Sequence, residues 1–153
     1  MLLVKKNNRM IKKNIIMEEK IKITELDYMR LSGIVRTARN KKGIELNNLD
    51  ALAREINRAE KVDSNCIEPE YVTMNSIVQV ENIETQRPMT IKIVYPKEAD
   101  FKKGYVSVLS PLGSALLGYK IGDIVKFDAP KGLVTIKILS VEYQPEANGV
   151  YTI

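Results

Sequence analysis

The sequence predicts an α+β protein, in which an N-terminal antiparallel coiled-coil hairpin of two helices precedes a mostly antiparallel five-stranded sheet with one short helix. Two observations carry this prediction. Between residues 24 and 58, apolar residues recur at spacings of three and four, which is the period of one helix face. From residue 77 onward, short runs rich in β-branched residues alternate in polarity and end at proline or glycine, which is typical of strands.

The two helices are predicted from matching apolar stripes and from their expected ends. Thr24 can cap the first helix, with the Asp27 carboxylate also available to the free amides of the first turn, and Gly43 is expected to end it. Asn47 is expected to cap the second helix, with Asp50 in its first turn. The stripes are Tyr28, Leu31, Val35 and Ala38 in the first helix, and Leu46, Leu49, Ala53 and Ile56 in the second.

The tight connection between these helices predicts an antiparallel hairpin, and about 16 residues per helix give a rod of only about 24 Å. The expected organisation of the chain is a basic tail at 1–20, the helical hairpin at 21–60, a polar connector at 61–71 and the sheet domain at 72–153.

Five strands and one helix are predicted in the sheet domain. The strands begin at Ile77 and continue with Thr90–Tyr95, Tyr105–Leu109, Asp123–Phe127 and Val134–Tyr143, and the helix lies within Pro111–Gly118. Proline at the start and glycine at the end suit a single short helix. Residues 128–132 are expected to form the turn between the last two strands.

The net charge of +5 is concentrated in the tail. Residues 1–20 hold six basic and two acidic side chains, so the remaining chain carries only about +1. Such a body offers no broad surface for a phosphate backbone. We expect the tail to be disordered; Met17 as the physiological start and a weak contact of the tail with nucleic acid stay open as alternatives. No apolar run is long enough for a membrane span, and the single Cys66 fits a reducing cytoplasm.

The residue types disfavour an enzyme. The chain has no histidine and one cysteine, which excludes the usual nucleophile–base pairs and the standard zinc sites. We therefore expect neither a cofactor nor a metal. At the hairpin tip, Glu45 and Asp50 could share a metal ion, but Lys41 and Lys42 compete for the same oxygens. These four tip residues are interpreted as solvated ends and caps, with the metal site as the alternative.

A second candidate site lies at the corner between the third strand and the short helix. Ser110, Pro111 and Leu112 place small and apolar side chains there. Corners of this kind usually serve packing, but partner-binding residues also lie on loops held by a rigid sheet. Both interpretations, packing and docking, stay open from the residues alone.

Several blocks of the chain resemble a known family. These blocks are Tyr71–Ser76, Ile93–Pro96, Val106–Gly118, Ile121–Asp123 and Tyr143–Ala147. In this order they are similar to the Gre-factor superfamily of transcription proteins, and within it to the branch of the regulator of nucleoside diphosphate kinase, over about residues 22–151. The resemblance implies a sheet domain like that of the FK506-binding proteins and docking near the secondary channel of RNA polymerase. The resemblance further implies that, in Gre factors, a long coiled coil enters the channel and two acids at its tip help to bind the catalytic magnesium.

This sequence departs from the Gre pattern in two respects. Its hairpin is markedly shorter, and Glu45 and Asp50 are five residues apart among basic neighbours. We therefore expect a monomeric, cytoplasmic elongation regulator that binds the RNA polymerase core enzyme and competes with Gre factors without stimulating RNA cleavage. Two alternatives stay open: a genuine cleavage factor, and a peptidyl-prolyl isomerase of the same fold. Fold alone does not establish the latter.

Overall fold

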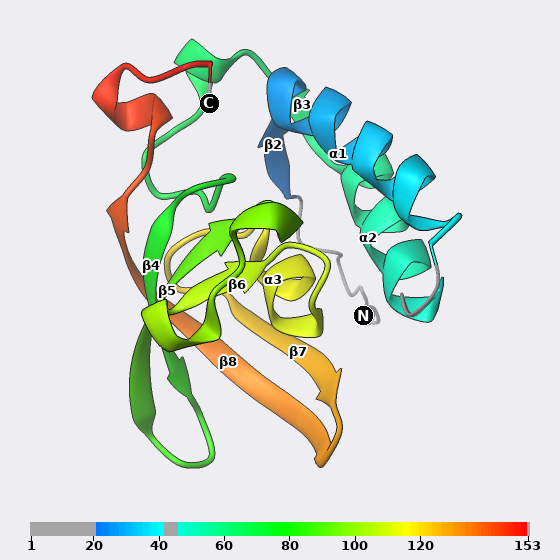
Figure 1. Ribbon diagram of the computed structural model, residues 1–153. Helices are drawn as coiled ribbons and strands as arrows, with labels where there is room; N and C mark the ends of the chain where they lie inside the picture. The colour runs from blue at the N-terminus through cyan, green and yellow to red at the C-terminus, as the bar shows by residue number, and fades with distance from the viewer. Residues whose placement is uncertain (1–20, 42–45, 153) are drawn as a thin grey trace, which may run out of the picture.

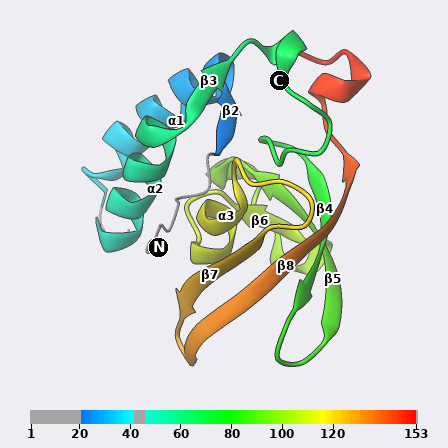
Figure 2. The same cartoon turned by 180° about the vertical axis from the view of Figure 1, so that it is seen from behind.

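The computed structural model describes residues 21–41 and 46–152, in which a pair of helices lies beside a curled sheet of five strands (Figures 1 and 2). This arrangement confirms the α+β class and the order of helices before sheet.

The helix pair consists of α1 (Glu25–Ala38) and α2 (Leu46–Arg58). Two contacts show that the helices run in opposite directions. Near the start of α1, the Tyr28 hydroxyl donates to Asn57 Oδ1 at the end of α2, at 3.1 Å. Beyond the end of α1, Arg39 forms an ion pair of 2.8 Å with Asp50 near the start of α2. At 1.5 Å per residue, the helices are about 21 and 20 Å long.

The described members of both stripes face the interior, as predicted, and the side chain of Leu46 lies outside the described part of the structure. Leu31, Val35 and Ala38 are buried on α1, and Leu49 and Ile56 are buried on α2. Leu52, which the predicted stripe did not include, is also buried. The boundaries of the two helices, however, differ from the predicted ones.

The end of α1 and the start of α2 were both misplaced. α1 ends at Ala38 and not at Gly43, which lies outside the described residues. The polar residues after Ala38 offer no apolar side chain to bury, so tertiary packing does not support further turns. α2 already begins at Leu46, so Asn47 lies inside the helix instead of capping it.

Two short strands were not predicted from the sequence. β2 (Lys22–Thr24) and β3 (Glu60–Val62) pair in parallel, with Lys22 opposite Glu60 and Thr24 opposite Val62. β3 overlaps the start of the segment that was expected to be a polar connector. A strand of three residues is too short to show alternation, and its pairing depends on a partner far away in the sequence. The two strands hold the free ends of the helix pair together.

The main sheet has the strand order β6-β5-β4-β8-β7. Its strands are β4 (Ile77–Asn82), β5 (Arg87–Val94), β6 (Tyr105–Ser107), β7 (Ile124–Ala129) and β8 (Gly132–Tyr143). Neighbours are antiparallel except for β5 and β6, which are parallel. All five strands were predicted; β6 is shorter than expected because the chain turns toward α3 after Ser107.

The short helix α3 (Pro111–Leu116) contacts both β6 and β7, which are the two edges of the sheet. A helix can contact both edges only if the sheet curls around it, as Figure 1 shows. The core is continuous from the helix pair to the sheet, because Ile23, Leu31 and Ile56 belong to the same buried cluster as the apolar side chains of β4, β5 and β8. The helix pair is therefore rigidly mounted on the sheet.

Candidate functional site

The corner between β6 and α3 was the first candidate site, and the structure assigns each of its residues a distinct position. The Ser110 hydroxyl caps α3 by accepting from the Gly113 amide at 3.1 Å, and it donates to the Ser107 carbonyl at 2.7 Å. Pro111 occupies the first turn and is partly exposed. Leu112 is partly buried against the core. Ser110 and Leu112 thus have structural roles, while Pro111 is available to a partner.

The helix α3 lies against the backbone of the corner without any space between them. A Cβ atom on Gly113 would lie 2.2 Å from the Ser107 carbonyl oxygen and 3.0 Å from Val108 Cα. Backbone atoms cannot move aside as a flexible side chain could, so this position requires glycine. The corner is therefore held in one conformation.

The helix pair is fastened to the same corner by Asn48 of α2. Its side-chain amide donates to the Leu109 carbonyl, and its Oδ1 lies 3.4 Å from the Ser114 hydroxyl. Asn48 therefore joins the two parts of the molecule at the place where the docking residues were predicted. The sequence pattern gave no signal for this contact, because it links residues 61 positions apart.

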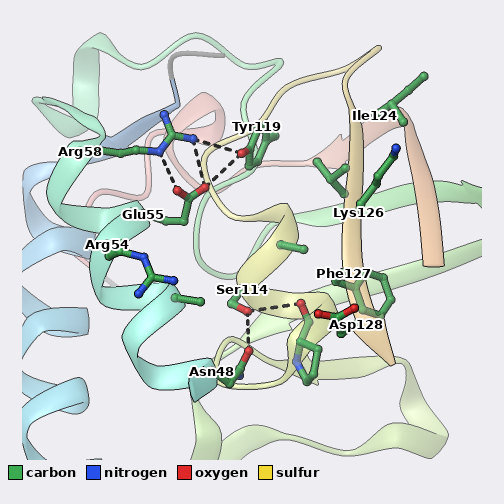
Figure 3. Close-up of a pocket in the computed structure, with 14 residues that line it drawn as sticks. Asn48, Arg54, Glu55, Arg58, Ser114, Tyr119, Ile124, Lys126, Phe127 and Asp128 are labelled. Atoms are coloured by element: carbon green, nitrogen blue, oxygen red, sulfur yellow. Dashed lines mark hydrogen bonds and ion pairs between the residues drawn. The ribbon is translucent and has the colours of Figure 1, made fainter. Parts of the chain in front are cut away.

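A groove opens beside the corner, and we call it the corner groove. It has a volume of about 740 Å³ and lies between α2, α3 and β7 (Figure 3). Pro111 and Ser114 line one wall, Arg54 lines another, and the side chains of Ile124–Asp128 line the third. The groove thus brings together residues from three elements that are distant in the sequence.

One end of the corner groove is closed by a polar cluster of Glu55, Arg58 and Tyr119 (Figure 3). Arg58 Nε lies 2.6 Å from Glu55 Oε2, and the Tyr119 hydroxyl donates to Glu55 Oε1 at 3.0 Å. Burial, followed by the negative charge of Glu55, raises the pKa of Tyr119 to about 12. Tyr119 therefore stays protonated at neutral pH and acts as a hydrogen-bond donor, not as a base.

The opposite wall of the corner groove is more apolar. Ile124 at the start of β7 is 56% exposed, and Phe127 is partly buried. Ile124 therefore adds accessible apolar surface to this wall of the groove. The sequence predicted a strand at Asp123–Phe127, but not that this strand would border a groove.

The hairpin tip was the second candidate site, and part of it is described. Lys41 is exposed, and Asp50 is occupied by its ion pair with Arg39. Both partners are nearly half exposed, with side-chain exposures of 46% for Asp50 and 43% for Arg39. Lys42 and Glu45 lie outside the described residues. Asp50 therefore does not present an unopposed carboxylate.

A buried polar cluster that the sequence did not indicate joins α1 to the sheet domain. Thr24 caps α1 as predicted, since its hydroxyl accepts from the Asp27 amide at 3.0 Å. The Asp27 carboxylate, which was expected to serve the first turn of its own helix, instead accepts from the Met74 amide at 3.1 Å. Close by, the Thr73 hydroxyl donates to Glu146 Oε1 at 2.7 Å.

The charges of this cluster are strongly affected by burial. Asp27 is only 2% exposed, and burial, with a smaller contribution from the negative charge of Glu146, raises its pKa to about 7. Burial also raises the pKa of Glu146. Burial, followed by the negative charge of Asp27, raises the pKa of Tyr95 to about 12. In the residues that the structure describes, no three carboxylate or cysteine side chains are grouped as metal ligands.

Two family models match the chain. The model described as transcription elongation factor GreA/GreB, C-terminal, matches residues 68–143, and the model of the Rnk N-terminus matches residues 19–62. The chain is 37% identical over 103 residues to the regulator of nucleoside diphosphate kinase (Rnk) of Escherichia coli strain K12, an alignment that spans 67% of this chain and 76% of that protein. The chain belongs to the GreA/GreB family.

Other members of the GreA/GreB family are similar over most of their length. Transcription elongation factor GreA of Maridesulfovibrio salexigens is 35% identical over 113 residues, which span 74% of this chain and 71% of that protein. The solved structure of a prokaryotic transcription elongation factor GreA/GreB from Nitrosomonas europaea matches with a TM-score of 0.67 and 35% identity, over 82% of this chain and all of that one. The similarity therefore includes the fold as well as the sequence.

Within the GreA/GreB family, the two matches confirm the predicted Rnk branch. In the described residues, the Rnk N-terminal match includes β2, α1, α2 and β3, and the GreA/GreB match extends from just before Tyr71 to the end of β8. The corner lies within the GreA/GreB match, whereas the corner groove combines residues from both matches. Among the helices that the structure describes, none is both long and apolar enough to cross a bilayer.

Proposed function

We propose that this GreA/GreB family member binds the RNA polymerase core enzyme near its secondary channel and regulates elongation by competing with Gre factors for that site. The observation that carries the proposal is the combination of a GreA/GreB-type sheet domain with a helix pair of only about 20 Å. Such a molecule can occupy the entrance of a channel without reaching far into it. RNA polymerase as the partner also implies a cytoplasmic location.

The proposed docking surface is the corner groove with the partly exposed Pro111 and the exposed Ile124. These two side chains are apolar and accessible, and they lie on a rigid frame formed by α3 and β7. A partner that buries them removes apolar surface from water at little cost in conformational entropy. Ser110 and Leu112, which were predicted to dock, support this surface through the cap and the core contact described above.

The proposed molecule does not stimulate RNA cleavage. A cleavage factor of this family would need free carboxylates at the far end of its rod to share a metal ion with the polymerase. Asp50 is bound by Arg39, and Lys41 adds positive charge to the same tip. Positive neighbours compete with a cation for carboxylate oxygens, so this tip is poorly suited to magnesium.

Two finer structural interpretations belong to the proposal. We propose that the helix pair is a short coiled coil and that the sheet domain is of the FK506-binding-protein type, because the antiparallel seam and the five curled strands around α3 support both. A prolyl isomerase activity is not part of the proposal. We further propose that the protein acts as a monomer.

A binding experiment with one matched pair of variants tests the docking surface. The exposed Cys66 is the single cysteine of the chain, so it can carry a fluorescent label for anisotropy titrations with core polymerase. Ile124→Glu is expected to weaken binding at least tenfold. Leu133→Glu is the control, because Leu133 is also 56% exposed but does not line the groove.

Two results would contradict the docking surface. Equal affinities of both variants and the unchanged protein would remove the corner groove from the interface. No binding of the unchanged protein to core polymerase at micromolar concentration would contradict the proposed function as a whole. An unlabelled Gre factor is expected to displace the labelled protein.

A further inference from the structure

A second groove lies on the other side of the corner, and we call it the basic groove. It has a volume of about 760 Å³ and separates α1 from the segment that follows β5, where Tyr95, Pro96 and Lys97 line it. Leu109 of the corner closes one side. The proposed docking surface does not include this groove.

The charged residues that line the basic groove all carry the same sign. They are Arg30, Arg36, Lys41 and Lys97, and among the described residues no aspartate or glutamate lines the groove. Arg30 is partly committed, because Nη2 donates to the Thr152 carbonyl at 2.9 Å and the buried Asp27 is close enough to affect it electrostatically. In the described part of the chain, Arg36, Lys41 and Lys97 form no ion pair. Three cations are thus available to a partner.

The floor of the basic groove is apolar. Ile34 of α1 and Leu109 are partly buried in it, and Pro96 is exposed. An apolar floor between cations is suited to a ligand that carries negative charges on either side of an apolar group. The floor is also rigid, because it is supplied by a helix, a proline and the corner that glycine holds in place.

From these observations we infer that the basic groove binds an acidic protein segment, in which carboxylates pair with Arg36, Lys41 and Lys97 and an apolar side chain lies on Ile34 and Leu109. Charge complementarity provides orientation and a fast approach, and the apolar contact provides much of the affinity. This inference goes beyond the proposed function, because it does not depend on which protein supplies the segment.

A nucleic acid fits the basic groove less well. Its bases would need an exposed aromatic face for stacking, and within the described part of the chain Tyr95 is the only aromatic residue that lines the groove. Tyr95 is half-buried, and its hydroxyl is in the interior. The aliphatic floor therefore favours a protein segment over RNA.

The test uses three fluorescent probes with the full chain: a peptide of glutamate and aspartate around a central Leu-Leu pair, the same peptide with Ser-Ser at its centre, and a ten-nucleotide poly-U RNA. We expect the Leu-Leu peptide to bind at least fivefold more tightly than the Ser-Ser peptide, and more tightly than the RNA. The double variant Arg36→Glu/Lys97→Glu should weaken its binding at least tenfold. Lys131→Glu is the control, because this exposed lysine lies in the turn between β7 and β8.

Each other outcome overturns the inference. Absence of binding at about 0.5 mM peptide, or equal binding of both peptides, would exclude the acidic–apolar ligand. Tighter binding of RNA that the double variant abolishes would assign the groove to nucleic acid. Self-association in sedimentation that the double variant abolishes would assign it to a second copy. Because Arg36 and Lys97 are both exposed, the double variant is expected to show an unchanged thermal melt, which checks that it is folded. Ile34→Ser is an independent variant, because it changes the apolar floor of the groove.

Discussion

Asp27 is buried and Glu146 is partly buried at the place where α1 meets the sheet domain. The folded protein raises the pKa of Asp27 to about 7, whereas in the unfolded chain it lies near 3.8. Between these values the folded protein keeps the proton and the unfolded chain loses it. Raising the pH through this window therefore favours the unfolded chain, and above about pH 7 no further stability is lost through this group.

The first prediction concerns this pH dependence. In urea titrations, the free energy of unfolding at pH 5.5 should exceed that at pH 7.5 by about 2 kcal/mol, since each pH unit below the folded pKa corresponds to about 1.4 kcal/mol. Asp27→Asn cannot ionise but still offers an oxygen to the Met74 amide, so it should reduce the difference by at least half. An equally large difference in Asp27→Asn would contradict the assignment. Glu146→Gln should reduce the difference between the two pH values less than Asp27→Asn does.

The second prediction concerns the glycine at the corner. Gly113→Ala should lower the free energy of unfolding by about 2 kcal/mol or more, because its methyl group would collide with the backbone of Ser107. Gly33→Ala is the matched control, because its nearest neighbour is the Arg36 guanidinium at 3.9 Å. This helix position should gain about 0.5–1 kcal/mol. A small effect at Gly113 would show that the corner can move.

For single residues, the sequence predicted contacts between neighbours in the chain more reliably than contacts between residues far apart in the chain. The cap by Thr24 follows from its spacing to Asp27, and Pro111 in the first turn of α3 follows from the sequence of the corner. The bond from the Met74 amide to Asp27 links residues 47 positions apart. No local pattern contains such a contact, so the buried cluster could not be predicted.

The two helices are held to the sheet by apolar burial and by few specific polar contacts. One of these contacts is made by Asn48 of α2, which contacts the Leu109 carbonyl and the Ser114 hydroxyl at the corner. The exposed bond in which Asn57 accepts from the Tyr28 hydroxyl, by contrast, joins the two helices to each other and not to the sheet. Asn48, unlike Asn57, therefore contributes to the orientation of the helix pair on the sheet.

The third prediction follows from this difference. Asn48→Ala should lower the free energy of unfolding by about 1–2 kcal/mol, because it leaves a partly buried carbonyl without its donor. Asn57→Ala should cost less than about 0.5 kcal/mol, since water replaces an exposed bond. Both values can be measured by chemical unfolding. Equal losses would show that the Asn48 contact does not fix the helix pair.

Element positions were largely predictable, and the failures have a common cause. Strands such as β8 and the stripe on α1 carry long, regular apolar patterns that only one structure satisfies. β2 and β3 have three residues each, and the end of α1 depends on where burial stops. These features are determined by packing with distant segments and not by local sequence.

At the scale of the whole molecule, a helix pair shares one core with a curled sheet, and one groove lies on each side of the corner. The class of the fold could be derived from periodicity, but the grooves could not, because each combines side chains from separate elements. The corner groove is apolar at Ile124 and mixed in charge elsewhere, whereas the basic groove combines an apolar floor with charged residues that are all positive among the described residues. We expect the two to bind different chemical surfaces.

The most direct test of the central proposal is a cleavage assay on backtracked RNA polymerase complexes, with and without a Gre factor. Alone, the protein should not accelerate release of short RNAs, because its rod is short and Asp50 is paired with Arg39. Added in excess, the protein should reduce the rate of Gre-stimulated cleavage at least fivefold. Acceleration by the protein alone, or no effect on the Gre factor at saturating concentration, would contradict a regulator that occupies the channel without activating cleavage.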